Sequence, residues 1–539
     1  MFKKRVVLFG VLIALLPILA WLLWPLESNQ FPITFNQQAI DSKEEFLNQY
    51  IAVDTTYRPP NIIIFLADDL AQTDISLYGS ERIQTKHIDA IGRNGVTFTD
   101  GYVTSPICSP SRAGLLTGRY QQRFGHEFQP HDIYLTNRFQ YYGFKGFVDS
   151  YPWTPIYMDA VPEKGERKRQ GLPPGEITLA ELLKKRQYHT AFLGKWHLGA
   201  ADFALPCNRG FDYNYGFYAS HSLFGPEEAE WIVNRHVPED WTDSYIWKTS
   251  RVGESAMYRN CERIEEPAYL TQRIAEEAIS FMETHEEEPF FLYVPFNAPH
   301  TPLQAPKTYV EQFSHIEDET KKVYHAMIAS LDDAVGSVMN KLEELHLMEN
   351  TLVFFLSDNG GATYTMTTDN APFKGGKVTN FEGGIRVPYM MQWKGKIAAS
   401  QTINYPVTAL DIFTTAAAAA RLELPKDRVF DGINLLDIVA DTVPELADRS
   451  LFWQMGNARA IRKGDWKLLV DDEFQDTLLY NLAVDYVEQQ NQTRTQREKQ
   501  QLLLQELNNW TAQLAPPLWP GMIYYQFEDE DGTIYRFAD

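Results

Sequence analysis

The chain has 539 residues, a hydrophobic content of 44% and a net charge of −22. This length exceeds one ordinary domain, although one large core can account for most of it, and the apolar content supports a globular body. So acidic a chain is a poor match for a general nucleic-acid binder. It also lacks broad attraction for polyanions, so any attraction for an anionic substrate must be local.

Residues 1–26 form a separate N-terminal segment. Residues 3–5 are basic, and the following run 6–26 contains no charged residue. The run is long enough to span a bilayer, and Trp21 and Trp24 stand where side chains anchor a helix at the membrane interface. A cleaved signal peptide has the same start, but no clear small-residue cleavage site follows, so we favour an uncleaved signal anchor. Either alternative exports the body to the periplasmic or extracellular side.

The rest of the chain divides into a linker and two folded parts. Residues 27–58 read as a polar linker. Strand-like and helical segments then alternate over residues 59–430, which predicts an α/β domain with a large, mainly parallel sheet and helices on both faces. Residues 431–539 are expected to form a smaller C-terminal α+β subdomain with an antiparallel sheet. The expected helices include residues 178–187, 270–285, 320–346 and 494–513.

Two short apolar runs, 61–67 and 351–357, end in oxygen-bearing side chains. Each run reads as a buried strand, and parallel strands present the residues after their C-terminal ends at one edge of the sheet. Three carboxylates and one amide would repel each other there unless they bound a hard divalent cation. The residues are Asp68 and Asp69 after the first run, and Asp358 and Asn359 after the second.

Cys108 lies in the run Ser105-Pro106-Ile107-Cys108-Ser109-Pro110-Ser111-Arg112. Pro110 suits the first turn of a helix that Gly118 is placed to end, so Cys108 should lie near a helix N-terminus, which favours anions. Arg112 would return to the same face one turn later. His126 follows closely enough to be a second candidate for substrate contact.

Three further segments supply cationic or proton-transferring side chains. Lys195 and His197 alternate at the end of an apolar run and are expected to face the same side of a strand. His300 follows the run 289–296, and a histidine can transfer a proton near neutral pH. Lys374 follows the second acidic pair, whereas Lys377 reads as a solvated charge as readily as a site residue.

Residues 138–170 interrupt the alternating pattern with many aromatic and basic side chains. Aromatic faces pack on sugar rings and cations pair with sulfate groups, so we hypothesise that this insertion helps form a glycan cleft. The alternative is a loop whose aromatic residues cover the sheet.

These blocks, from about residue 60 to about residue 390, resemble the type I sulfatases, the formylglycine-dependent branch of the alkaline-phosphatase-like superfamily. The C-x-P-x-R form at Cys108 and the G-K-W-H-L-G block at residues 194–199 are specific in combination. The resemblance implies that a maturation enzyme converts Cys108 to Cα-formylglycine (3-oxoalanine). It also implies one Ca²⁺ per chain, although ligand types alone do not distinguish Ca²⁺ from Mg²⁺. The implied ligands are Asp68, Asp69, residue 108, Asp358 and Asn359.

The resemblance also assigns roles to the cationic residues. Arg112 would orient the hydrated aldehyde, and Lys195 and Lys374 would neutralise the sulfuryl oxygens. His300 would protonate the leaving group, and His197 would assist sulfate release. The expected reaction is hydrolysis of sulfate esters, with a sulfated carbohydrate as the expected substrate.

Two other functions remain as alternatives. One is a phosphonate or phosphate monoester hydrolase of the same superfamily, and the other is a non-catalytic homologue that binds sulfated glycans. The sequence leaves open whether Cys207 and Cys261 form a disulfide or stay free.

Overall fold

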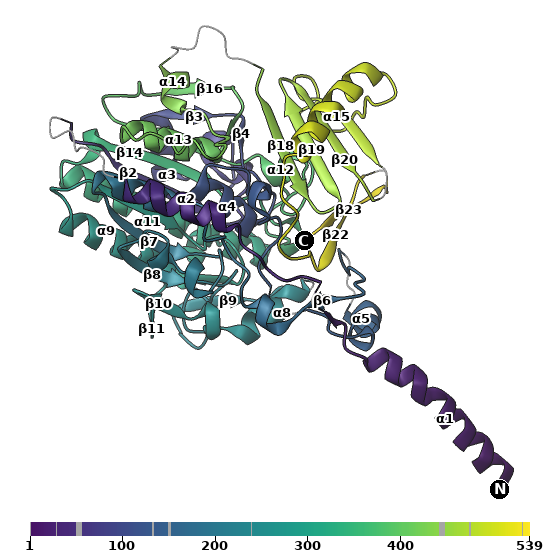
Figure 1. Cartoon of the computed structure of the whole chain (residues 1–539). Coiled ribbons are helices and arrows are strands. Elements are labelled where there is room, and N and C mark those ends of the chain that lie inside the picture. The colour runs from purple at the N-terminus through teal and green to yellow at the C-terminus, as the bar shows by residue number, and fades with distance from the viewer. Residues whose placement is uncertain are drawn as a thin grey trace.

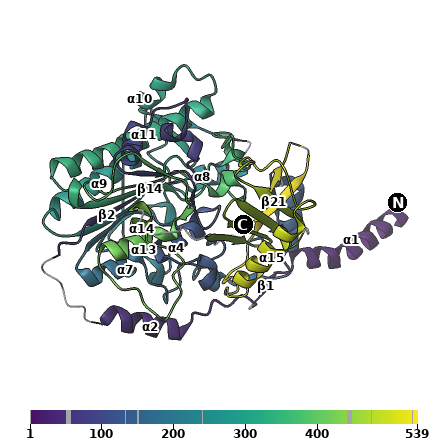
Figure 2. The same ribbon diagram turned by 90° about the horizontal axis from the view of Figure 1, so that it is seen from above.

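The computed structural model describes residues 2–28, 30–49, 57–131, 134–148, 152–238, 240–440, 448–473, 476–530 and 532–539. The side chains of residues 2–12, 28, 147, 148 and 241 lie outside this description. A large α/β body carries a C-terminal unit on one side, and α1 (Phe2–Leu23) projects from it as a long helix (Figure 1). The view from above shows the same projecting helix (Figure 2).

A ten-stranded sheet forms the centre of the body. Its five middle strands, β8, β7, β12, β2 and β14, are parallel, and antiparallel strands extend it on both sides. The predicted mainly parallel sheet is therefore confirmed. In spatial order the strands are β11 (Glu262–Ile264), β10 (Met257–Arg259), β8 (Tyr213–Phe217), β7 (His189–Lys195), β12 (Phe290–Pro295), β2 (Asn61–Ala67), β14 (Thr351–Ser357), β15 (Tyr389–Gln392), β3 (Val96–Phe98) and β16 (Gln401–Ile403).

Helices cover both faces of this sheet because its central strands are apolar on both sides. Along β2, Ile63 and Phe65 belong to the core on one face, whereas Ile62 and Ile64 belong to the core on the other. The first face is covered by α3 (Lys86–Arg93), α9 (Leu270–Thr284) and α11 (Glu319–Glu344), and the second by α4 (Cys108–Thr117), α7 (Leu179–Leu183) and α13 (Leu410–Ala419).

The C-terminal unit contains the expected antiparallel sheet with a helix against it. The helix packs through Leu503, Leu507 and Trp510 onto a core that includes Leu468 of the sheet. The elements are β18 (Ser450–Met455), β19 (Ala458–Lys463), β20 (Trp466–Asp471), β21 (Thr477–Asn481) and α15 (Arg497–Thr511). A boundary at residue 431 stays a prediction.

A second small sheet connects the insertion to the C-terminus. The hairpin of β22 (Ile523–Glu528) and β23 (Ile534–Ala538) pairs with β5 (Trp153–Pro155). Part of the insertion, β5, therefore forms a sheet with the C-terminal hairpin.

Cys207 and Cys261 form a disulfide, with 6.4 Å between their Cα atoms, and Cys108 is the free, buried cysteine. This resolves the two alternatives that the sequence left open.

Within the described part of the chain, no helix combines the length and the apolar character needed to cross a bilayer. The predicted anchor at residues 6–26 falls partly on residues 6–12, whose side chains lie outside the described residues. The anchor therefore stays a prediction.

Candidate active site

The acidic residues of the two strand ends meet at one edge of the central sheet. β2 and β14 pair in parallel, with Ala67 opposite Ser357, so the residues that follow both strands emerge together. These residues are Asp68, Asp69, Asp358 and Asn359, and each is at most 5% exposed. A hydrogen bond from Asn359 Nδ2 to Asp69 Oδ1, 2.7 Å long, joins the two strand ends. The edge predicted from sequence is thus present.

Cys108 is the first residue of α4, as the motif predicts. Its Sγ lies 3.5 Å from Asp68 Oδ1 and 4.0 Å from Asp69 Oδ1. The helix ends at Gly118, where a φ of 66° suits a residue without a side chain. Burial, and after it the negative charge of Asp358, raises the pKa of the Cys108 thiol. Burial therefore disfavours the thiolate, which is the reactive form of cysteine.

Two of the predicted cations balance the acidic edge. Arg112 donates to Asp358 Oδ2 from Nε at 2.8 Å and to the main-chain carbonyl of Lys195 from Nη1 at 2.8 Å. Lys195 Nζ contacts both carboxylate oxygens of Asp68, at 2.9 and 2.7 Å. Both side chains are fully buried, so their charges act in a medium of low polarity.

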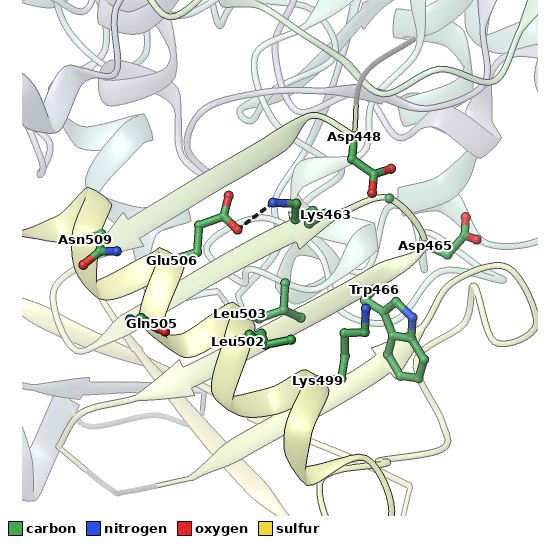
Figure 3. Close-up of a pocket in the computed structure, with 11 residues that line it drawn as sticks. Asp448, Lys463, Asp465, Trp466, Lys499, Leu502, Leu503, Gln505, Glu506 and Asn509 are labelled. Atoms are coloured by element: carbon green, nitrogen blue, oxygen red, sulfur yellow. Dashed lines mark hydrogen bonds and ion pairs between the residues drawn. The ribbon is translucent and has the colours of Figure 1, made fainter. Parts of the chain in front are cut away.

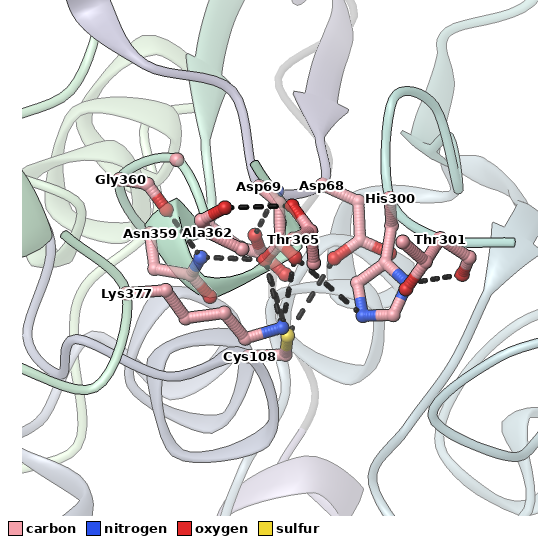
Figure 4. A network of polar contacts seen from close by, with 12 residues as sticks. Asp68, Asp69, Cys108, His300, Thr301, Asn359, Gly360, Ala362, Thr365 and Lys377 are labelled. Carbon is pink, nitrogen blue, oxygen red and sulfur yellow. Dashed lines mark hydrogen bonds and ion pairs between the residues drawn. The ribbon is translucent and has the colours of Figure 1, made fainter. Parts of the chain in front are cut away.

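The third cation is Lys377 and not Lys374. Lys377 Nζ lies 2.8 Å from Asp69 Oδ1 and 2.9 Å from Asp69 Oδ2 (Figure 4). Lys374 instead pairs with Asp529 at 2.5 Å and lies over the ring of Phe381, so these contacts do not support its predicted sulfate-binding role. The chain turns between them at Gly375, whose φ is 71°. The sequence Gly375-Gly376-Lys377 could have indicated that Lys377 is the site lysine, because paired glycines permit such a close turn.

His300 joins the cluster from the loop after β12. Its Nε2 lies 3.6 Å from Asp69 Oδ2, and its Nδ1 contacts the carbonyl oxygen of Thr301 (Figure 4). Burial, and after it the charge of Lys377, lowers the pKa of His300 to about 3. An anion bound beside the ring would oppose this shift.

The other two predicted histidines are placed differently from expectation. β7 ends at Lys195, and His197 lies beyond it with a φ of 55°, so the shared strand face was a wrong prediction. Burial, followed by the Lys195 charge, holds the pKa of His197 well below its usual value. His126 is fully buried behind α4, where Nε2 pairs with Ser109 Oγ at 2.8 Å. This contact joins His126 to α4, and its predicted contact with substrate stays a prediction.

The charges of the site are strongly coupled. Burial alone would raise the pKa of Asp69, but Lys377, His300 and Lys195 lower it to about 2. Burial raises the pKa of Asp358 against the opposing charge of Arg112.

The donor set fits a hard divalent cation. Asn359 Oδ1 is buried and has no hydrogen-bond partner among the described residues, although an unpaired buried carbonyl is costly. Oxygens of Asp68 and Asp69 lie within 4.8 Å of each other and of Cys108 Sγ. A cation beside these groups would satisfy the orphan oxygen and offset the carboxylate repulsion.

The aromatic insertion is only partly near the site. Trp153 packs against Tyr364 with ring centroids 5.0 Å apart. Two of its cations are already engaged, because Arg167 donates to the carbonyl of Pro162 at 2.7 Å and Arg169 pairs with Glu166 at 3.0 Å. The hypothesis that they serve a glycan cleft gains no support.

A separate pocket of about 560 Å³ lies in the C-terminal unit between α15 and its sheet (Figure 3). Trp466, Lys499 and Leu502 line it, and Lys463 pairs with Glu506 at 2.8 Å across it. None of the predicted site residues lines this pocket.

Comparison with known proteins decides the family. A family model described as Sulfatase matches residues 60–422, which include every predicted metal ligand. The chain belongs to the sulfatase family. This sulfatase is a sulfuric ester hydrolase of the alkaline-phosphatase-like superfamily.

Two curated sulfatases show the extent of the sequence similarity. N-acetylgalactosamine-6-sulfatase of Rattus norvegicus is 33% identical over 457 residues, covering 83% of this chain and 79% of the rat protein. Steryl-sulfatase of Homo sapiens is 32% identical over 438 residues, covering 70% of this chain and 69% of the human protein.

Solved structures share the fold. Ps i-CgsB, crystallised in complex with k-i-k-neocarrahexaose, superposes with a TM-score of 0.71 at 29% identity, covering 86% of this chain and 95% of that one. The phosphonate monoester hydrolase of Agrobacterium radiobacter has a TM-score of 0.56 at 19% identity, covering 88% and 99%, and shares the fold alone.

Proposed function

We propose that this sulfatase removes sulfate from a sulfated carbohydrate, with Cys108 as the precursor of its nucleophile. The observation that carries the proposal is the position of Cys108 Sγ, 3.5 Å from Asp68 Oδ1 at the start of a buried helix. The carbohydrate preference is supported by the N-acetylgalactosamine-6-sulfatase relative and by the neocarrahexaose complex of Ps i-CgsB.

Conversion of Cys108 to formylglycine would supply a hydrated aldehyde with two hydroxyls. One would attack sulfur while the S–O bond to the sugar breaks, and the other would then lose its proton and expel sulfate, which restores the aldehyde. Burial raises the pKa of the Cys108 thiol, which disfavours the thiolate that direct thiol chemistry would need. Arg112, one turn further along α4, would hold the oxygens at position 108 in a fixed direction.

Asp68, Asp69, Asp358 and Asn359, together with residue 108, would hold one Ca²⁺. Bound there, the cation would act as a Lewis acid that withdraws charge from a sulfate oxygen. Ca²⁺ is preferred over Mg²⁺ on the family resemblance, while the all-oxygen ligands fit both.

Lys195 and Lys377 would neutralise the sulfuryl oxygens. Their Nζ atoms now contact Asp68 and Asp69 respectively, so both ammonium groups are already held at the acidic edge. Such fixed charges stabilise a developing negative charge without reorganisation. His300 would donate a proton to the departing alcohol oxygen, and His197 would assist the release of sulfate.

We further propose that the enzyme is exported and held at the membrane by residues 6–26. The uncharged run and the preceding basic residues support this. The disulfide between Cys207 and Cys261 is also typical of an oxidising compartment. Recovery of the native enzyme in the cytosolic fraction would contradict export.

Replacement of Cys108 by Ala tests the nucleophile. We expect activity on sulfate esters to fall by at least about 10³-fold, because the attacking group is lost. Mass spectrometry of the native peptide spanning residue 108 should show a loss of about 18 Da against the thiol. Parent activity in a folded, metal-loaded Ala variant would refute the mechanism. Comparing aryl sulfate with aryl phosphate and phosphonate esters separates the sulfatase from its superfamily alternative.

A further inference from the structure

More than half of the exposed large hydrophobic side chains of the described residues gather at one end of the molecule. They lie on α1, at Trp24 just after it, on α5 (Arg138–Gly143) and at Tyr157, and α5 packs beside α1 (Figure 1). Eleven of the twenty such side chains belong to this group: Ile13, Leu15, Leu16, Ile18, Leu19, Trp21, Leu23, Trp24, Phe139, Tyr142 and Tyr157. So large an apolar surface marks an interaction site.

The rings at the base of α1 form a continuous set. Trp21 and Tyr142 have centroids 6.5 Å apart, Tyr142 and Tyr141 5.2 Å, and Tyr141 and Tyr157 5.0 Å. Arg138 lies over Trp21 at 4.9 Å. We call Trp21, Trp24, Phe139, Tyr141, Tyr142 and Tyr157 the aromatic collar.

The collar is fixed to the catalytic body through the chain that follows α1. Leu26 donates its N–H to the carbonyl of Thr136 at 2.8 Å and accepts from Val161 N–H at 2.9 Å. Leu26, Tyr134 and Val161 are buried together. A residue just before the insertion and one within it therefore hold Leu26, so the chain that leaves α1 is attached to the catalytic body.

The exposed side chains of α1 indicate which kind of partner surrounds this helix. Ile13, Leu16 and Leu19 are 55%, 61% and 47% exposed, and the side chains between them are exposed too, so over residues 13–19 every face of the helix is apolar. A protein partner or a second copy would cover one face, whereas lipid surrounds all of them. A sugar chain would require hydrogen-bonding groups that this surface of α1 lacks.

The collar itself has the chemistry of a membrane boundary. Its tyrosine and tryptophan rings combine an apolar body with a polar tip, as side chains at the headgroup level do. Arg138 and the exposed Lys145 add positive charge where lipid phosphates would lie.

We propose that the aromatic collar seats the catalytic body on a phospholipid bilayer. Phe139, Tyr142 and Tyr157 enter the headgroup region beside the base of α1, so the insertion is a membrane-docking element. The proposal rests on the membrane anchor proposed for residues 6–26 and not on the sulfatase mechanism. Flotation of the protein with the vesicles tests the anchor separately from the collar.

Fluorescence quenching in proteoliposomes of the full-length protein tests this. A bimane label is placed at Phe139→Cys or Tyr157→Cys, and at Tyr486→Cys as a matched control, since Tyr486 is 49% exposed on the C-terminal unit. Cys108 is buried and Cys207 is paired with Cys261, so only the new thiol reacts. Phosphatidylcholine–phosphatidylglycerol vesicles carry a nitroxide near the headgroup.

We expect quenching at positions 139 and 157 to exceed that at 486 by at least about twofold. Parent activity on a soluble aryl sulfate shows that each labelled variant is folded. Equal quenching at 139 and 486 overturns the proposal. Protection of position 139 by a sulfated polysaccharide, or by dimer formation without lipid, also overturns it and identifies the other occupant.

Discussion

Two clusters of buried charge lie on either side of the segment from Lys377 to Glu382, and they are built differently. In the second cluster, Lys467 Nζ pairs with Glu382 Oε1 at 2.9 Å and with Glu488 Oε1 at 2.8 Å. Arg462 pairs with Asp100 at 2.6 Å, and Tyr102 donates to Glu382 at 2.7 Å. Each of these charges has a partner.

The active-site cluster also pairs its cations with carboxylates, but it leaves Asn359 Oδ1 without a partner. It also gathers three aspartates on one edge, next to a cysteine. Burial of charge alone therefore does not identify a functional site. A ligand site is distinguished by hydrogen-bond acceptors that the protein leaves without partners, as in the active-site cluster. The cluster around Lys467 instead holds the C-terminal unit in place.

Removal of the metal should have the largest effect. Dialysis against a chelator is expected to lower activity by about 10³-fold or more, because the site would lose its Lewis acid. It should also lower the free energy of unfolding by about 3 kcal/mol if Ca²⁺ had been present at about 100 times its Kd. Activity assays and urea unfolding before and after adding back Ca²⁺ or Mg²⁺ measure both. An enzyme indifferent to chelation would contradict the ligand assignment.

Replacement of Lys377 by Ala should have the next largest effect. We expect activity to fall by about 10²–10³-fold, as for the loss of one fixed group that stabilises transition-state charge. The matched control is Lys374→Ala, since Lys374 pairs with Asp529 outside the site. That variant should keep activity within about threefold of the parent. The opposite order would restore the role that the sequence assigned to Lys374.

Replacement of Lys467 by Met tests the second cluster. The change leaves Glu382 and Glu488 without their shared cation, so we expect a loss of about 3–5 kcal/mol in the free energy of unfolding. The folded fraction should retain turnover within about threefold, because Lys467 touches no residue of the acidic edge. Urea titration and activity per folded molecule measure the two effects. A loss of turnover without a loss of stability would mean that the clusters are not separate in function.

Replacement of Glu488 by Gln should have the smallest effect, visible as a change in pH dependence. Burial and Glu382 raise the pKa of Glu488, against the opposing charge of Lys467, from 4.5 to about 7. The folded state therefore binds the proton more tightly, and stability should fall as pH rises from about 4.5 to 7. The Gln variant should flatten this fall, by about 1 kcal/mol or more, in unfolding measured across the window. An unchanged slope would assign the dependence to another group.

The parts predicted from sequence are those set by local patterns. Apolar runs that end in acids locate β2 and β14, while Pro110 marks the first turn of the nucleophile helix and Gly118 its end. Local sequence patterns did not predict which of Lys374 and Lys377 lies at the acidic edge. It depends on the turn at Gly375 and on Asp529, which lies 155 residues away from Lys374 in the chain.

The other errors have similar causes. His197 lies past the end of its strand, where the alternation of sides no longer holds. The composition of the insertion indicates aromatic contact but not which partner supplies it. The structure shows that α5 of the insertion packs beside α1. These two segments are separated by more than a hundred residues, so local patterns do not predict their contact.

The complete burial of Cys108 sets an order of events during synthesis. A maturation enzyme must reach the thiol with its own active site, and once α4 packs onto the sheet the thiol has no exposed surface that a second enzyme could contact. Modification and folding therefore compete in time, and chains that fold first are trapped as inactive thiol protein. Adding the maturation enzyme to such finished protein should not rescue it, whereas supplying that enzyme during translation should.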